Sequence, residues 1–265
     1  MTAARYGAWL YHAFIVAVCA FIVAPIVAAV VLSFSSAPQL TLPPPGLSLR
    51  WYIKAAATRE FSAAIGTSAA IAACVSVLSM VTGTLAAIAV NHHRFRARAV
   101  VQTLLMLPLV LPGVVIGLAL LQTLSLYGLR PGFLAAVLGH TVIGTPYVSY
   151  LVLSALANYD LTLEHASLNL GASRTHTFVR ITLPLVRPGV IAGGVFVFLL
   201  SFDNVALSIF LTRGDTLPLR LMQHIQYYAD PSVAAVSAVL IVFSLVVLAL
   251  VGRLLRDRGD LRLVA

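Results

Sequence analysis

The feature that most limits the fold is a series of long apolar segments separated by short polar ones. Hydrophobic residues make up 60% of the 265 residues and charged residues only 9%, as is typical of integral membrane chains. A bilayer core about 30 Å thick needs roughly 20 apolar residues in a helix to cross it. Six segments of that length can be drawn, at residues 9–32, 63–90, 99–122, 132–157, 188–211 and 232–252.

These segments predict an all-α integral membrane fold. Lipid offers no partner to backbone polar groups, so each segment must satisfy its own as a helix. We expect six transmembrane helices in a single domain over residues 1–265. The first segment follows Arg5 and continues past Pro25 to Leu32. This is longer than the apolar core of a signal peptide, about 7 to 15 residues, and we expect an uncleaved span.

The distribution of Lys and Arg predicts the orientation. With both termini in the cytoplasm, the inner segments hold 11 of the 17 basic residues, and the asymmetry fits the positive-inside rule. The inner residues are Arg5, Arg94, Arg96, Arg98, Arg174, Arg180, Arg187, Arg253, Arg256, Arg258 and Arg262. We therefore attribute the net charge of +9 to the orientation of the chain in the membrane and to contact with anionic lipid, and not to nucleic-acid binding.

A polar loop at residues 158–187 lies between two apolar segments and has a helical pattern of its own. Asp160 is a candidate cap for a short helix, expected over residues 161–170. Leu163, Ala166, Ser167 and Leu170 fall at helical spacing and predict one small, apolar stripe.

Local signals also predict where this loop changes direction. Gly171 suits the left-handed position that ends a helix, and Ser173 suits the start of a second one. Phe178 and Ile181 would share a side of that second helix, which Pro184 is expected to stop. A hairpin lying on the lipid surface is the alternative, but small residues suit a protein groove better.

Asp203 is the only carboxylate that falls within a predicted span. A charge at mid-bilayer costs on the order of 2.5 to 3.5 kcal/mol, so such a residue usually faces a cavity or a partner. At 1.5 Å per residue it lies about 20 to 25 Å along the span that starts near Pro188. It is the first candidate for a solute pathway, and a carboxyl satisfied by a neighbouring helix is the alternative.

Other signals within the spans are weaker. Pro108, Pro112 and Gly113 predict a kink or break in the third span, either to line a cavity or for packing. Ser79, Gly83 and Ala87 predict close helix packing. Further intramembrane polar side chains are candidates for the pathway or for bonds to a neighbouring helix, and these are Gln102, Gln122, His140, Tyr147, Tyr150 and Asn204.

The polar loop resembles the E-A-A loop in the membrane subunits of binding-protein-dependent ABC importers. The matching residues are Glu164, Ala166, Leu170, Gly171, Ala172, Ser173, Phe178, Ile181, Leu183, Pro184, Pro188 and Gly189. Beyond the loop, the segments 46–52, 93–98, 201–212 and 216–221 are similar to the C-type subunit of spermidine/putrescine permeases. Two departures concern the loop, where His165 and Ser167 replace the frequent Glu and Ala. A third is Asn204, where polyamine permeases tend to have a second Asp.

The resemblance implies a type I importer permease fold in a bacterial cytoplasmic membrane. It implies a second permease subunit, expected to be a distinct homologue, two cytoplasmic ATPases and an extracytoplasmic solute-binding protein. The loop would be a coupling helix, with Glu164, Ala166, Leu170, Gly171, Ala172, Ser173, Phe178 and Pro184 at the ATPase. The chain has no G-x-x-x-x-G-K-[ST] sequence. We therefore expect a non-catalytic subunit without cofactor or metal, whose partner binds ATP.

The expected cargo is a polyamine, with Asp203, Asn204, Tyr147 and Tyr150 along its path. An aminoalkylphosphonate, ferric ion or inorganic anion is the alternative, because related permeases serve all of them. Asn204 in place of a second carboxylate weakens attraction for a diamine. Arg130, Arg213 and Arg220 on the outer side favour an anion if they line the entrance, and contact with acidic residues of the binding protein is the alternative. A secondary transporter or channel would need coupling carboxylates or a filter, and a single Asp among six spans argues against it.

Overall fold

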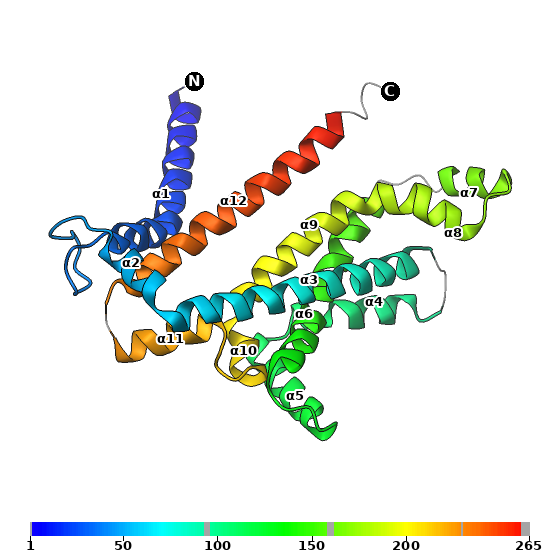
Figure 1. Cartoon of the computed structure of the whole chain (residues 1–265). Helices are drawn as coiled ribbons and strands as arrows, with labels where there is room; N and C mark the ends of the chain where they lie inside the picture. The colour runs from blue at the N-terminus through cyan, green and yellow to red at the C-terminus, as the bar shows by residue number, and fades with distance from the viewer. Residues whose placement is uncertain (1, 93–95, 158–161, 229, 261–265) are drawn as a thin grey trace. The chain divides into compact units, whose positions relative to one another are not determined.

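A computed structural model describes residues 2–92, 96–157, 162–228 and 230–260, and this part of the chain is mostly helical (Figure 1). The helices are α1 (Thr2–Ser33), α2 (Arg50–Ala57), α3 (Arg59–His92), α4 (Arg98–Met106), the 3-10 turn η1 (Leu107–Leu109), α5 (Gly113–Leu126), α6 (Phe133–Ala157), α7 (Thr162–Asn169), α8 (Arg174–Thr177), the π turn η2 (Phe178–Thr182), α9 (Leu183–Phe202), α10 (Val205–Leu211), α11 (Leu217–Tyr227) and α12 (Ser232–Asp260).

Five of these stretches are long and apolar enough to cross a membrane, and they are Trp9–Ser33, Arg59–Asn91, Phe133–Ala157, Arg174–Phe202 and Ser232–Arg253. A sixth is formed if Arg98–Leu109 and Gly113–Leu126 count as one span, although they meet at an angle of 106°. The break expected from Pro108, Pro112 and Gly113 is therefore confirmed. Proline lacks the N–H that would continue the helix, and Pro112 takes an extended conformation before Gly113 starts α5.

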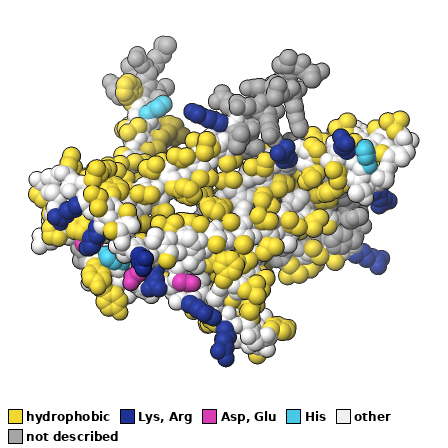
Figure 2. Space-filling model, viewed as in Figure 1, with side chains coloured by type: hydrophobic (Ala, Val, Ile, Leu, Met, Phe, Trp, Pro, Cys, Tyr) yellow, Lys and Arg dark blue, Asp and Glu magenta, His cyan; other side chains and the backbone are white. Residues whose placement is uncertain are grey.

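The chain divides into two compact units. Unit 1 holds Met1–Ser62 and Leu221–Leu245, and unit 2 holds Ala63–Arg220 and Val246–Ala265. Apolar side chains cover most of the face drawn in Figure 2, and charged side chains are few. This surface suits lipid, which solvates apolar side chains as well as a protein core does.

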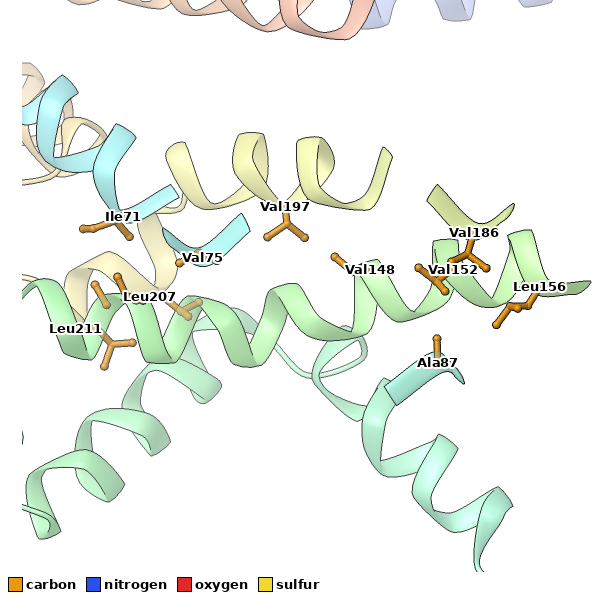
Figure 3. Close-up of a cluster of buried hydrophobic side chains, with 12 residues drawn as sticks. Ile71, Val75, Ala87, Val148, Val152, Leu156, Val186, Val197, Leu207 and Leu211 are labelled. Carbon is orange, nitrogen blue, oxygen red and sulfur yellow. The ribbon is translucent and has the colours of Figure 1, made fainter. Parts of the chain in front are cut away.

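Unit 2 is built around α3, α6 and α9. Buried side chains from these helices and from α10 form one apolar cluster, in which Val148 and Val152 of α6 lie beside Val186 and Val197 of α9 (Figure 3). Because lipid removes most of the hydrophobic drive for association, close packing and hydrogen bonds must hold such helices together.

Small residues bring α3 against α6. Ser79 and Ala87 are fully buried, and a Cβ atom placed on Gly83 would lie 2.7 Å from Val148 Cβ. The close packing predicted for this face is confirmed.

Hydrogen bonds between the helices reinforce the same core. Ser149 Oγ donates to the Gly83 carbonyl at 2.9 Å, and Ser76 Oγ donates to the Gly194 carbonyl at 2.7 Å. The hydroxyls of Thr82 and Thr145 are 2.8 Å apart. These three bonds tie α3 to both α6 and α9.

Unit 1 is held by polar contacts around α2. The indole N–H of Trp51 donates to the Ser35 carbonyl at 2.7 Å. Lys54 Nζ lies 2.6 Å from Asp230 Oδ2, and His224 Nε2 lies 3.4 Å from Asp230 Oδ1. Burial raises the pKa of Asp230, but hydrogen bonds from Lys54, Ser232 and His224 outweigh it and lower that pKa to about 2.

Two helix boundaries differ from those predicted. The prediction that Pro184 stops the second short helix is wrong, because α8, η2 and α9 form one span from Arg174 to Phe202. Pro184 lies in the first turn of α9, where its missing N–H is tolerated, and the wider π turn before it relieves the clash with its ring.

The other difference concerns the fifth predicted span. The helix expected over residues 188–211 is interrupted after Phe202, and α10 begins at Val205. Asn204 causes the interruption locally: its backbone is extended and its side chain caps the new helix. Neither proline nor glycine occurs at this break.

Candidate functional site

Two regions of unit 2 carry the residues singled out from the sequence, and they lie at opposite ends of α9 (Figure 1). The α7–α8 hairpin precedes α9, and the interruption at Asp203 and Asn204 follows it. Since α9 has 20 residues, these regions are about 30 Å apart along its axis.

The turn of the α7–α8 hairpin is a Schellman cap. Gly171 has φ +88°, and its N–H donates to the Leu168 carbonyl at 3.0 Å. The N–H of Ala172 donates to the Ser167 carbonyl at 3.2 Å, which completes the motif. Ser173 Oγ then accepts from the His176 N–H at 3.2 Å and starts α8. Both local predictions, Gly171 as a helix end and Ser173 as a helix start, are confirmed.

Side chains of α7 bind it to the following helix. Thr182 of η2 donates from its hydroxyl to Glu164 Oε1, and the Ser167 and Thr177 hydroxyls are 2.9 Å apart. Glu164 and Ser167 therefore face η2 and α8. Leu163, Ala166 and Leu170 are exposed, and Leu170 has 89% of its surface free.

The predicted stripe is therefore only partly right. Its apolar members form the outer surface of the hairpin, but Ser167 faces inward and bonds to Thr177 of α8. Phe178 is half-buried in η2 and Pro184 is exposed at the start of α9, so these two lie beyond the hairpin itself. The Asp160 cap predicted for α7 falls on residues 158–161, outside the described residues.

The second region is the interruption between α9 and α10. Asp203 is the C-terminal cap of α9, and Asn204 Oδ1 accepts from the Leu207 N–H at 2.9 Å. The Asp203 side chain is exposed and forms no hydrogen bond or ion pair within the described residues. The alternative of a carboxyl satisfied by a neighbouring helix is therefore not observed. The exposed carboxylate of Asp203 therefore lies between the negative C-terminal end of α9 and the positive N-terminal end of α10.

A small cavity lies beside the interruption. Its lining residues come from α6, from α9 and from the break, namely His140, Ile143, Gly144, Val197, Leu200, Ser201 and Asn204, and it has room for about one water molecule. His140 is 4% exposed, and its Nδ1 lies 2.8 Å from Ser201 Oγ. Only the presence of a histidine within an apolar segment signalled this site in the sequence, because Ser201 is 61 residues away.

The two tyrosines lie further along α6. Tyr147 is two turns, about 10 Å, beyond His140 toward the α7 end, and its ring packs against Phe196 at 4.9 Å between centroids. Tyr150 is 62% exposed. Of the four predicted pathway residues, the structure thus brings together Asp203 and Asn204. Their neighbours are His140, a weaker candidate from the sequence, and Ser201, which sequence analysis did not select.

Comparison with known proteins identifies the family. Residues 79–259 match the model of the binding-protein-dependent transport system inner membrane component. That match covers well over half of the sequence. The chain belongs to this family.

Curated relatives match this permease over 62% to 95% of its length. It is 30% identical to the spermidine/putrescine transport system permease protein PotC of Escherichia coli, over 95% of the chain and 96% of that protein. It is also 30% identical to the putrescine transport system permease protein PotI of Escherichia coli, over 83% of the chain and 82% of that protein. A probable molybdenum ABC transporter permease of Haloferax volcanii is 31% identical over 62% of the chain and 65% of that protein.

Solved structures share the fold of the permease. A bacterial ABC transporter involved in the import of the polysaccharide alginate matches with a TM-score of 0.71, at 14% identity, over 97% of this chain and 98% of that one. An amino acid ABC transporter matches with a TM-score of 0.61, at 16% identity, over 78% of this chain and 98% of that one. The permease thus has the type I ABC importer fold. It is a non-catalytic, multi-pass membrane subunit of a binding-protein-dependent ABC importer.

Proposed function

We propose that the importer served by this permease moves a polyamine such as putrescine or spermidine. The observation that carries this proposal is the near full-length similarity to PotC, whereas the molybdenum relative matches only part of the chain. Polyamines carry positive charge and primary ammonium groups, so a path for them needs negative potential and hydrogen-bond acceptors.

The electrostatics of the α9–α10 interruption support a cationic cargo. A helix C-terminus acts as roughly half a negative charge, but the N-terminus of α10 at the same break has the opposite partial charge, so the exposed carboxylate of Asp203 supplies the net negative potential. The C-terminal ends of interrupted helices help to bind cations in other transporters. Asn204 leaves this site with one carboxylate instead of two, which predicts weaker attraction for a diamine than in a site with both.

An inorganic oxyanion is the second candidate cargo, favoured by the similarity to the molybdenum permease. Three arginines on the predicted outer side would attract an anion. One of them is already engaged, because Arg213 Nε donates to the Pro131 carbonyl at 3.2 Å. Its guanidinium keeps its charge and its other N–H donors, so the arginines still support an anion path.

For the energy supply, we propose that the α7–α8 hairpin docks on a cytoplasmic ATPase and that an extracytoplasmic binding protein delivers the cargo. A second permease chain, expected to be a distinct homologue, would complete the pore, and both termini would lie in the cytoplasm. The exposed Leu163, Ala166 and Leu170 would enter a groove of the ATPase. The bonds from Glu164 and Ser167 to the next helix would transmit its movement to α9.

Uptake tests the polyamine proposal. The complete importer is expressed in cells that lack their own polyamine importers, and entry of labelled putrescine and spermidine is compared for wild type, Asp203→Asn and Asp215→Asn. We expect Asp203→Asn to lose most uptake. Asp215→Asn is the matched control, because it removes one carboxylate at another position. An assembled wild-type importer that takes up neither polyamine would refute the proposed cargo.

A pair of glycine variants tests the coupling proposal. Gly171 and Gly128 both have positive φ, and a Cβ on either would meet nothing within 4 Å. Gly171→Asp and Gly128→Asp therefore introduce the same strain and the same charge in two different loops. We expect only Gly171→Asp to release the ATPase or to uncouple ATP hydrolysis from uptake. Equal uptake by both variants would rule out docking through this hairpin.

A further inference from the structure

The free carboxylate of Asp203 indicates which side of α9 does not face lipid. A charge within the membrane is costly in lipid, and such residues face a water-filled path or a protein partner instead. Seven residues make nearly two full turns of an α-helix, so Phe196 lies within about 20° of Asp203 around α9 and about 10 Å from it along the axis. Phe196 is 44% exposed. It therefore lines the same path or interface as Asp203.

The opposite side of α9 is occupied by helix packing. Gly193 and Gly194 are both buried. A Cβ atom on Gly193 would lie 3.0 Å from Val148 Cα of α6, and one on Gly194 would lie 2.4 Å from the sulfur of Met80 of α3. Within the described residues, the side of α9 that carries Phe196 is therefore open, and the side that carries the glycines is closed.

Phe196 forms an aromatic pair with Tyr147 of α6. Their ring centroids are 4.9 Å apart and the ring planes meet at 51°. Tyr150 follows one turn later on α6, is 62% exposed, and its hydroxyl has no hydrogen-bond partner within the described residues. A free hydroxyl is a second polar group that lipid cannot satisfy. The faces of such rings carry partial negative charge and attract an ammonium group within about 6 Å of the ring centre.

The order of side chains along this face matches a linear amine. Leu199 and Leu200 are half-buried and lie between the carboxylate of Asp203 and the Phe196–Tyr147 pair. The face thus has an anionic end, an aliphatic middle and an aromatic end. A linear amine has an ammonium group, a methylene chain and a second ammonium group, and each part meets a side chain of suitable chemistry.

The spacing of the two ends restricts the length of the amine. An extended chain advances about 1.2 Å per bond, so the end nitrogens of putrescine, five bonds apart, span about 6 Å, and those of spermidine, nine bonds apart, span about 11 Å. The carboxylate and the aromatic pair are about 10 Å apart along α9. Only the longer amine can reach both at once.

We propose that this face of α9 is a two-point cargo site, in which Asp203 binds one end ammonium group of a long linear amine and the Phe196–Tyr147 pair binds the other by cation–π attraction. This inference rests on the proposed polyamine function and adds a preference for an amine of the length of spermidine. Putrescine occupies one of the two points at a time.

The test compares uptake of labelled spermidine and putrescine by the complete importer in proteoliposomes. Uptake by each variant is divided by that of wild type for the same amine, so that the preference of the binding protein cancels. Phe196→Leu removes the ring, and Phe196→Tyr keeps it. Phe198→Leu is the matched control, because Phe198 lies about 160° away around α9 and stacks on Phe202, with 6.0 Å between centroids. Assembly and ATPase rate are measured for every variant.

Phe196→Leu is expected to lower spermidine uptake about fivefold, as for the loss of one cation–π contact, and to change putrescine uptake by less than about twofold. Phe196→Tyr should stay within about twofold of wild type for both amines, because the ring remains. Phe198→Leu should affect both amines equally. A purely structural role for Phe196 would lower both uptakes together with assembly.

Failure of the site and failure of the proposed function give different results. If wild type moves neither amine, the polyamine function is wrong and the site falls with it. If wild type moves both and Phe196→Leu leaves their ratio unchanged, the two-point site alone is wrong. Wild-type uptake of putrescine without spermidine also overturns the site. Should Phe196→Leu not assemble, Phe196→Met takes its place, and a wild-type ratio of the two amines in that variant overturns the proposal.

Discussion

Replacing Gly83 by alanine would test whether α3 and α6 are packed at the limit of backbone contact. The added Cβ would lie 2.7 Å from Val148 Cβ and 2.8 Å from the Thr145 carbonyl oxygen. Ordinary carbon contacts begin at about 3.5 Å, so the helices would have to separate by about 0.8 Å. Rotation of a side chain cannot relieve this overlap, because Thr145 O belongs to the backbone.

The expected cost has two parts. Overpacking at a close contact costs about 1 to 3 kcal/mol. Separation of the helices would also stretch the bond of 2.9 Å from Ser149 Oγ to the Gly83 carbonyl, worth about 1 kcal/mol. Alanine also favours the helix by up to about 1 kcal/mol, so we expect Gly83→Ala to lower the free energy of unfolding by about 1 to 3 kcal/mol.

Titration with SDS in mixed micelles, followed by far-ultraviolet circular dichroism, would measure this loss. Gly66→Ala is the matched control on the same helix, because a Cβ on Gly66 would meet nothing within 4 Å. That variant should be neutral or up to about 1 kcal/mol more stable, since alanine favours the helix. Equal free energies of unfolding for the two variants would refute the close approach of α3 and α6.

Three further predictions concern other contacts. Asp230 has a pKa lowered from 3.8 to about 2, so its stabilisation of unit 1 is complete above about pH 4 and is lost as the pH falls toward 2. Asp230→Asn should abolish this dependence in melts between pH 2 and 7, with a loss of about 1 kcal/mol at pH 7 because Lys54 is half-exposed. Asn204→Ala should destabilise α10 by about 1 kcal/mol, because the helix loses its N-terminal cap. Asn204→Asp keeps the cap and adds a second carboxylate, so it should raise putrescine uptake. Uptake below wild type in Asn204→Asp would contradict the cationic path. Thr182→Val removes the bond to Glu164 and should speed amide hydrogen exchange in α7, whereas the exposed Thr175→Val should not.

Features that depend on neighbouring residues could be predicted from the sequence. The Gly171 turn and the Ser173 cap follow from backbone preferences that operate within a few residues. The break near Pro112 follows from the missing N–H of proline. The six apolar segments follow from the thickness of a bilayer, although one of them is the bent pair α4 and α5.

Features that depend on distant residues could not be predicted. Pro184 signals a helix end by its own chemistry, yet the π turn at Phe178–Thr182 lets the helix continue. No proline or glycine occurs at Asp203 and Asn204, so the sequence carries no helix-breaking residue that would predict this interruption. The pairing of His140 with Ser201 requires α6 and α9 to be packed together, and no pattern within either segment encodes that contact.

The hydrogen bonds among α3, α6 and α9 have a consequence for motion. Ser76, Ser149 and the Thr82–Thr145 pair connect three helices whose glycines and serines already interlock. Sliding one helix past another would break these bonds in lipid, where no water replaces them. We therefore expect these three helices of unit 2 to move together during a transport cycle. Alternating access would then arise by rocking of such groups of helices against each other, and not by rearrangement inside one.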